Sequence, residues 1–193
     1  MKLLSLLLTA AAVAGMMACG SSRTTQPEIP SMASASPAVA PTTTTMSSPD
    51  MAAVLFAANQ GEIDMANAAM PKLSSNDARQ FAAMMIADHG TALTNVRNVM
   101  AANHIIAHDA AGSAIDLRNK TQQNVTYFTT AGGSVDRPYM VSQVEAHQQL
   151  LDMMDHAMIP SSRGDLLTLL QSMRPTVAAH LDRARAILGS MQQ

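Results

Sequence analysis

The feature that most constrains this fold is the stretch from residue 136 to 158, where apolar side chains recur at alternating spacings of four and three. That spacing places them on one face of an α-helix and is typical of the buried face of a bundle helix. The face comprises Met140, Val144, His147, Leu151, Met154 and Met158. Because His147 alone is not apolar, the stretch predicts a bundle helix with one polar group on its buried side.

Three other long stretches predict helices whose apolar face is interrupted in the same way. The interrupting residues are Glu62, His89 and His180. The predicted helices run over residues 48–70, 76–102 and 165–191, with a shorter and less regular helix over 113–130. No strand-like alternation stands out. The sequence therefore predicts an all-α fold, a four-helix bundle with an additional short crossover helix.

Composition supports helices and argues against one class of partner. The chain has 193 residues, of which 48% are hydrophobic and only 3% aromatic. Alanine, leucine and methionine supply most of the core volume, and all three favour helix. A formal net charge of −2 without a large basic run excludes nucleic acid as the expected partner.

The N-terminus has the pattern of an export signal. Lys2 precedes a short apolar run over residues 3–13, and Met16-Met17-Ala18-Cys19 resembles the bacterial lipobox. Cleavage before Cys19 and lipid attachment to it would anchor the protein to a membrane. Gly20 after the cysteine resembles an outer-membrane address. We therefore expect a cell-envelope protein, either an outer-membrane lipoprotein facing the periplasm or a periplasmic protein.

Three segments follow from these patterns. Residues 1–19 form the predicted lipoprotein-type signal peptide ending at the lipidated cysteine. Residues 20–49, rich in Ser, Thr, Pro and Ala, form a predicted disordered tether. Residues 50–193 form the predicted helical bundle.

The four polar interruptions predict a site. Each lies near the middle of its helix, so antiparallel packing would bring Glu62, His89, His147 and His180 to one level. Burying a polar group without a partner costs roughly 2–7 kcal/mol, so the four must either bond to one another or hold a metal. One carboxylate and three imidazoles suit zinc, iron, copper or manganese. Asp88 is expected to be a further ligand or an acceptor that orients an imidazole.

Several spaced motifs resemble a known family. They are Ala58-x-x-Gly61-Glu62-Ile63, Phe81-Ala82-x-Met84-Met85-Ile86-x-Asp88-His89, Gly133-x-x-Asp136-Arg137-x-Tyr139-Met140 with His147, and Pro175-x-x-x-x-His180-Leu181-x-x-Ala184. In this order they resemble the bacterial domain of unknown function family 4142, over about residues 51–188. The resemblance implies a ferritin-like bundle, often exported, and brings no established reaction.

The sequence departs from di-iron enzymes of ferritin-like fold. Those enzymes use Glu-x-x-His on two helices. Here Ile86, Val144 and Val177 stand three residues before the histidines. A mononuclear metal site or a purely polar layer fits the sequence better than a carboxylate-rich di-iron site.

Two functions follow from the sequence. The first is a metal-binding envelope protein that uses the four polar residues. The second is a non-catalytic structural, stress or interaction protein whose buried polar layer only fixes helix register, with an unspecified protein partner. Oxidoreductase chemistry would need an open coordination position and a substrate channel, and the sequence indicates neither, so no catalytic residue is predicted.

Overall fold

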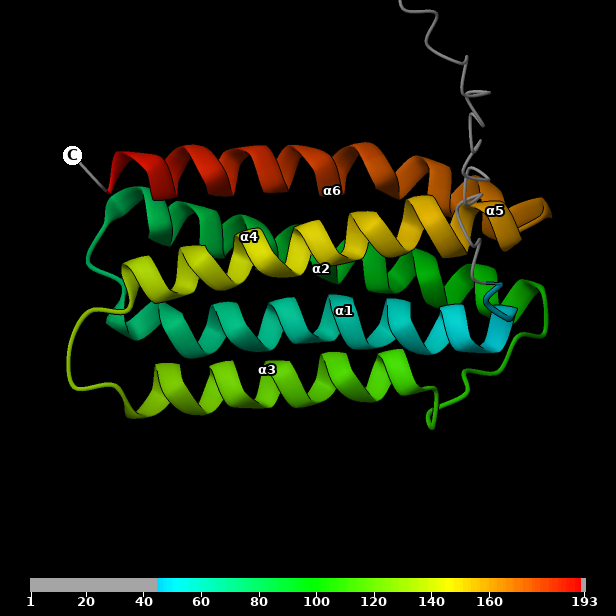
Figure 1. Cartoon of the computed structure of the whole chain (residues 1–193), viewed down its shortest axis with the longest axis horizontal. Coiled ribbons are helices and arrows are strands. Elements are labelled where there is room, and N and C mark those ends of the chain that lie inside the picture. Colours follow the sequence, from blue (N-terminus) through cyan, green and yellow to red (C-terminus); the bar gives the residue numbers. More distant parts are fainter. Residues whose placement is uncertain (1–44, 192–193) are drawn as a thin grey trace, which may run out of the picture. The chain divides into compact units, whose positions relative to one another are not determined.

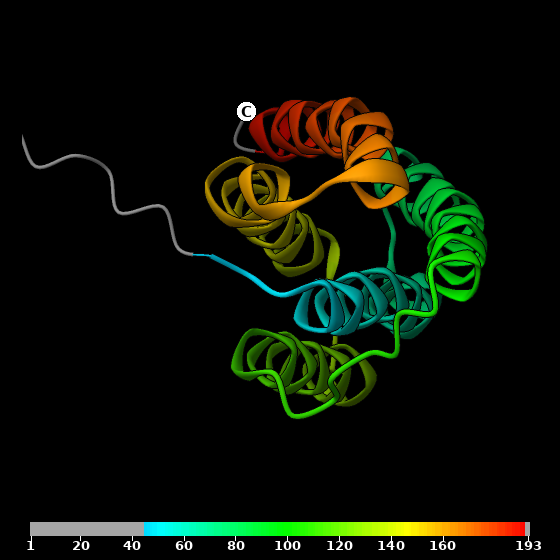
Figure 2. The ribbon, with the colours of Figure 1, turned by 90° about the vertical axis from the view of Figure 1, so that its right-hand side faces the viewer.

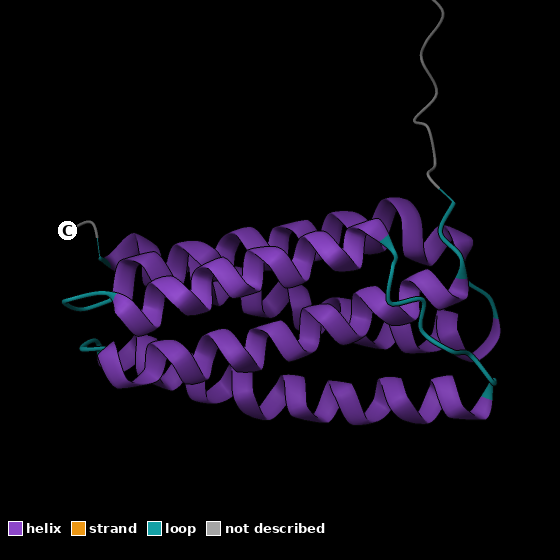
Figure 3. Ribbon diagram, turned by 90° about the horizontal axis from the view of Figure 1, so that it is seen from below, coloured by secondary structure: helices purple, strands orange, loops and turns teal. Residues whose placement is uncertain are grey.

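The computed structural model describes residues 45–191, and the chain over this range is an all-α bundle. Its five long helices lie roughly side by side (Figure 1; Figure 3). They are α1 (Ser48–Ala69), α2 (Asn76–Ala102), α3 (Gly112–Thr130), α4 (Asp136–Met153) and α6 (Gly164–Ser190). The predicted signal peptide, the lipidated Cys19 and the tether up to residue 44 lie outside the described residues. None of the described helices combines the length and apolarity needed to cross a bilayer.

Serine side chains begin the first two helices. The Ser47 hydroxyl accepts a hydrogen bond from the Asp50 backbone N–H at 3.3 Å, and Ser75 does the same for Ala78 at 3.4 Å. These bonds satisfy N–H groups that have no partner within the helix. Both helices begin within a residue of the starts predicted at residues 48 and 76.

The fourth helix continues beyond its predicted end. The sequence predicted a helical stretch ending at residue 158, but a π-helical turn (Met154–Met158) leads directly into the short α5 (Ile159–Ser161). In that turn the Ile159 N–H bonds to the Met154 carbonyl, five residues back. The wider turn carries the chain through Pro160 without a break, so the predicted end at residue 158 was wrong.

Four helices surround the core and the fifth lies outside it. In the end-on view, α1, α2, α4 and α6 form the bundle, and α3 lies along the outer side of α1 (Figure 2). Gly61 on α1 permits this contact, because a Cβ atom there would clash with the Thr121 hydroxyl of α3. The helix predicted as a short crossover therefore also covers one face of α1.

The buried apolar side chains form two clusters rather than one continuous core. The first cluster includes Met51, Leu55, Met100, Met154 and Leu170, and the second includes Phe81, Met85, Phe128, Tyr139 and Met140. Along each of the four bundle helices, the chain passes from one cluster to the other through buried polar residues. The bundle thus has two apolar halves with a polar layer between them.

Candidate metal site

The polar layer brings together three histidines from three helices. His89 comes from α2, His147 from α4 and His180 from α6, and each residue is at most 5% exposed. The three ring centroids lie 5.4–5.7 Å apart. One ring nitrogen from each residue lies within 4.8 Å of one nitrogen from each of the other two. Three buried imidazoles this close together could hold a metal ion.

Each imidazole is held by an acceptor at one of its nitrogens. His147 Nδ1 lies 2.9 Å from the backbone carbonyl of Gln143, and His180 Nε2 lies 3.0 Å from a carboxylate oxygen of Asp88. His89 Nδ1 lies 2.9 Å from Asn59 Oδ1. A carbonyl or carboxylate oxygen can only accept, so each of these three ring nitrogens carries the proton and donates.

The Asn59 amide is itself oriented, which fixes the tautomer of His89. Its Nδ2 donates to the Leu55 carbonyl at 2.7 Å, so its Oδ1 must be the atom that faces the imidazole. The three rings thus share one pattern, in which one ring nitrogen donates a hydrogen bond to an oxygen that does not belong to the other two rings. This is the arrangement in which metal-binding histidines are usually held.

The other nitrogen of each ring has no hydrogen-bond partner within residues 45–191. These atoms are His89 Nε2, His147 Nε2 and His180 Nδ1, and all three are buried. A neutral imidazole carries a lone pair at the nitrogen that lacks the proton. Buried acceptors without partners are rare in folded proteins, because each one loses its bonds to water and gains nothing in return. Three of them in one layer could hold a ligand in common.

Burial keeps the three imidazoles neutral. It lowers the pKa of His89 from 6.5 to about 3, with repulsion from His147 and His180 adding to the effect. It also lowers the pKa of His147, to about 4. Burial lowers the pKa of His180 as well, and the hydrogen bond to Asp88 partly opposes this shift. At neutral pH all three rings therefore have the uncharged form that binds metals.

Glu62 lies in the layer but outside the group of three nitrogens. Its side chain is 5% exposed in total, and Oε2 accepts a hydrogen bond from Gln143 Nε2 at 2.6 Å. The other oxygen, Oε1, lies 4.0 Å from His147 Nδ1, on the side of the ring that already donates to the backbone. Burial raises the pKa of Glu62 to about 8, and the bond from Gln143 only partly opposes this rise. At neutral pH Glu62 is thus mainly a protonated carboxyl.

Asp88 occupies the second of its two expected positions. Its carboxylate accepts from the imidazole of His180 on α6, not from the adjacent His89. The Asp88 side chain is 45% exposed, whereas that of His180 is 6% exposed. The carboxylate therefore links the buried layer to the surface of the bundle.

Two buried amide residues of the layer were not predicted from the sequence. Asn59 and Gln143 are buried, 1% and 0% exposed, and each bonds to one of the predicted residues. A usable signal was present: Asn59 lies three residues before Glu62 and Gln143 four residues before His147. Polar residues at helical spacing from a buried polar residue share its face and are candidates to support it.

The remaining histidines and Glu145 lie elsewhere, as the sequence indicated. His104 and His108 belong to the segment between α2 and α3, and His156 is exposed on the π turn. Glu145 points away from His147 and lies 3.2 Å from Lys120 of α3, with both side chains 56% exposed.

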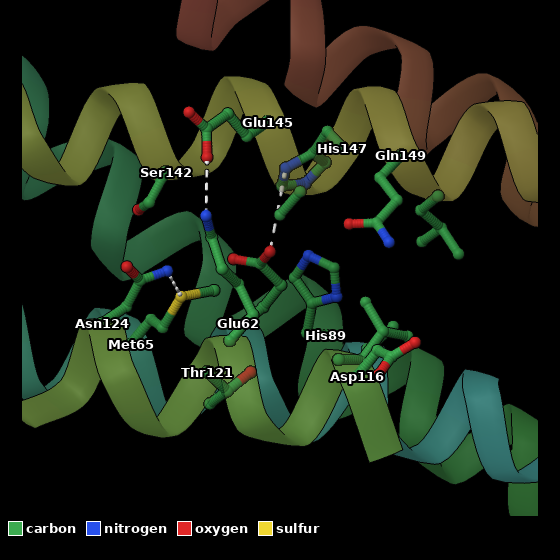
Figure 4. A pocket seen from close by; sticks show the side chains of 15 residues that line it. Glu62, Met65, His89, Asp116, Thr121, Asn124, Ser142, Glu145, His147 and Gln149 are labelled. Carbon is green, nitrogen blue, oxygen red and sulfur yellow. Dashed lines mark hydrogen bonds and ion pairs between the residues drawn. The ribbon is translucent and has the colours of Figure 1, made fainter. Parts of the chain in front are cut away.

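Two cavities reach the histidines from different sides of the bundle. One, of about 280 Å³, lies between α1, α3 and α4 and is lined by Glu62, His89 and His147 among others. Figure 4 shows these three side chains directed toward one another within this cavity. The second, of about 410 Å³, lies between α2 and α6 and is lined by Asp88, His89 and His180 among others. The layer is thus reached from both sides, and only His89 lines both cavities.

The residue three positions before each histidine is apolar, and its side chain is at least partly buried. Ile86 and Val144 are half-buried and Val177 is buried. Within residues 45–191, Glu62 is therefore the only buried carboxyl group beside the imidazoles. Over residues 45–191 the layer could supply nitrogen ligands to a single ion and lacks the bridging carboxylates of a di-iron site.

Comparison with known proteins gives a family but no function. No curated protein and no solved structure matches the chain. A family model described as Domain of unknown function (DUF4142) matches residues 33–187, which include all three histidines, Glu62 and Asp88. Because the match covers most of its length, this chain belongs to the DUF4142 family.

Proposed function

We propose that this protein binds one first-row transition-metal ion through His89, His147 and His180, in the cell envelope of a bacterium. The observation that carries the proposal is the meeting of three buried imidazoles, each with one ring nitrogen within 4.8 Å of a nitrogen of the other two. Each ring also has one buried nitrogen without a hydrogen-bond partner among residues 45–191 and one held by an acceptor. The envelope location rests on the N-terminal sequence pattern and on the expected lipid at Cys19.

The ligand set favours particular metals. Neutral imidazoles suit zinc, copper and iron, whereas manganese prefers more carboxylate and water oxygen. The nitrogens of a tetrahedral zinc site lie roughly 3.4 Å apart when the Zn–N bonds are about 2.0–2.1 Å. Because the three nitrogens already lie within 4.8 Å of one another, small side-chain movements would complete the set. Glu62 is a neighbouring carboxyl group and does not belong to this set of three nitrogen ligands.

The alternative function, a polar layer that only fixes helix register, explains less of the geometry. Such a layer would be expected to satisfy its own polar atoms, as Glu62 and Gln143 partly do. It gives no reason for three buried imidazoles, each with an unpaired ring nitrogen, to lie this close together. Metal binding accounts for them directly.

Metal titration of the purified protein tests the proposal. We expect one Zn²⁺ per chain after removal of bound metal with a chelator and dialysis. At a free metal concentration 100 times the Kd, binding adds about 2.7 kcal/mol to the free energy of unfolding, which corresponds to roughly 5–11 °C in Tm. If zinc, copper and iron all leave the Tm unchanged and none co-purifies, the proposal fails and the register function remains.

Replacing Asp88 with alanine tests the support of the site. Asp88→Ala removes the acceptor that holds His180 Nε2 and with it the orientation of that ring. We expect metal affinity to fall about 10–100-fold, the usual cost of losing such a partner. The matched control is Asp182→Ala, an 80% exposed aspartate on the same helix as His180, which should leave the affinity unchanged. Equal losses in the two variants would show a general effect of charge instead.

A further inference from the structure

The two cavities that reach the histidines differ in their linings. Around the α2–α6 cavity stand the oxygen-bearing side chains Asn59, Asp88, Thr91, Asn95, Ser172 and Thr176. No lysine or arginine is among the residues that line it. The cavity between α1, α3 and α4 is lined, besides Glu62, by the carboxylates of Asp116 and Glu145 and by Lys120, which forms an ion pair with Glu145. Met65, Leu117 and Leu150 also line it.

Hydroxyl and amide oxygens can replace the water molecules around a hydrated cation, and a carboxylate attracts it. Because burial keeps the histidines neutral, Asp88 is the only charged residue in the α2–α6 lining, and its side chain is nearly half exposed. One of its oxygens accepts from His180, while the other makes no hydrogen bond within the described part of the chain. A free carboxylate oxygen is therefore presented at the surface, directly beside a ring of the metal site.

The inner end of this cavity carries the groups that would receive the ion. His89 and His180 both line it, both are at most 5% exposed, and each has an unpaired ring nitrogen. Asp88 accepts directly from the ring of His180, so an ion at Asp88 would lie beside one member of the three-histidine group. His89 and His147 also line the other cavity, together with the Lys120–Glu145 ion pair.

We propose that the α2–α6 cavity is the path by which a hydrated divalent cation enters and leaves, with Asp88 and the surrounding hydroxyl and amide oxygens as its first binding site. This proposal rests on the proposed metal-binding function and adds the route and an outer cation site to it. The cavity between α1, α3 and α4 takes no part in the exchange of the ion.

Two matched substitutions separate the two cavities. Ala92 lines the α2–α6 cavity and Ala58 lines the other, and both are half-buried residues of bundle helices. A phenylalanine at either position would fill its cavity without removing a polar group. The measurements are the rate of Zn²⁺ uptake by metal-free protein in stopped-flow mixing and the rate of Zn²⁺ loss to excess chelator, with circular dichroism as the check of folding.

Ala92→Phe is expected to slow uptake and loss together, by about tenfold or more, and to leave the Kd within about threefold, because a blocked path changes rates and not end states. Ala58→Phe is expected to leave both rates unchanged. The proposal is overturned if Ala58→Phe slows exchange as much as Ala92→Phe, or if Ala92→Phe has no effect on either rate. A wild-type protein that takes up no Zn²⁺ would instead refute the proposed function itself, before any variant is compared.

Asp88→Asn then tests the charge alone. An asparagine oxygen can still accept from His180, so the ring stays oriented while the carboxylate charge is lost. We expect uptake to slow by about tenfold at low ionic strength and the difference to vanish near 1 M salt, where the Debye length is about 3 Å. An uptake rate that is independent of both the substitution and the salt would show that Asp88 does not guide the ion.

Discussion

Replacing His147 with leucine is expected to weaken metal binding by more than about 100-fold. The loss of a group that merely orients a ligand costs roughly 10–100-fold, and the loss of one of three ligands must cost more. Leucine has a similar size and continues the apolar face of α4, so the variant should still fold. The rise in Tm that metal gives to the wild-type protein should disappear, as followed by calorimetry with and without Zn²⁺.

The metal-free form of this variant provides a second readout. His147 is 1% exposed and its Nε2 has no partner in the described structure, so its removal also removes an unsatisfied group. The metal-free variant should therefore be as stable as the metal-free wild type or more stable. The matched control is His156→Leu at an exposed histidine near the end of the same helix, which should preserve metal binding. Equal metal affinity in the two variants would contradict the assignment of His147 as a ligand.

The second large effect is expected in the free energy of unfolding of the metal-free protein, which should depend strongly on pH. Burial lowers the pKa of His89 from 6.5 to about 3 and that of His147 from 6.5 to about 4. Below pH 6.5 the unfolded chain therefore binds protons that the folded chain excludes, and stability falls as the pH falls. The loss should reach several kcal/mol by about pH 4, which is comparable with the whole stability of a domain.

Glu62 has the opposite effect on the pH dependence of stability. Burial raises its pKa from 4.5 to about 8, so between these values the folded state holds a proton that the unfolded state has lost. Its contribution to stability therefore falls as the pH rises through this range. Below pH 6.5 the histidines outweigh it, and above pH 6.5 it acts alone among the residues of the layer. Stability should thus peak near pH 6.5 and fall by about 2 kcal/mol toward pH 8.

Urea unfolding in the presence of chelator, repeated across this pH range, measures the profile. The variant Glu62→Gln keeps the shape of the side chain but cannot ionise, so it should lack the decline above pH 6.5 and retain the decline in acid. An alkaline decline of the same size in the variant would show that another group causes it.

The level of the site could be predicted from the sequence, whereas its bonding could not. A polar residue on an otherwise apolar face must be buried, and its place along the helix fixes its depth. This is why Glu62, His89, His147 and His180 were expected at one level, and the structure places them there. The hydrogen-bond partners of these residues depend on the rotation of each helix about its axis. The spacing of apolar residues in the sequence defines that rotation only to within about one residue.

Two details illustrate that limit. On α2 a spacing of three and seven residues from His89 would put Ala92 and Val96 on the buried face, followed by Val99, but the buried residues are Leu93, Val96 and Met100. A helix of 3.6 residues per turn drifts relative to a regular spacing of four and three, so the face had rotated by this point. Similarly, the partner of Asp88 proved to be a histidine of another helix rather than its neighbour in sequence.

The division of the apolar core into two clusters has a consequence for substitutions at the middle level of the bundle. Each cluster holds the four helices together at its own end, so neither depends on the identity of the residues between them. Single substitutions at the middle level can exchange one donor atom for another while the scaffold persists. This chain could therefore change or lose donor atoms at the middle level without a change of fold.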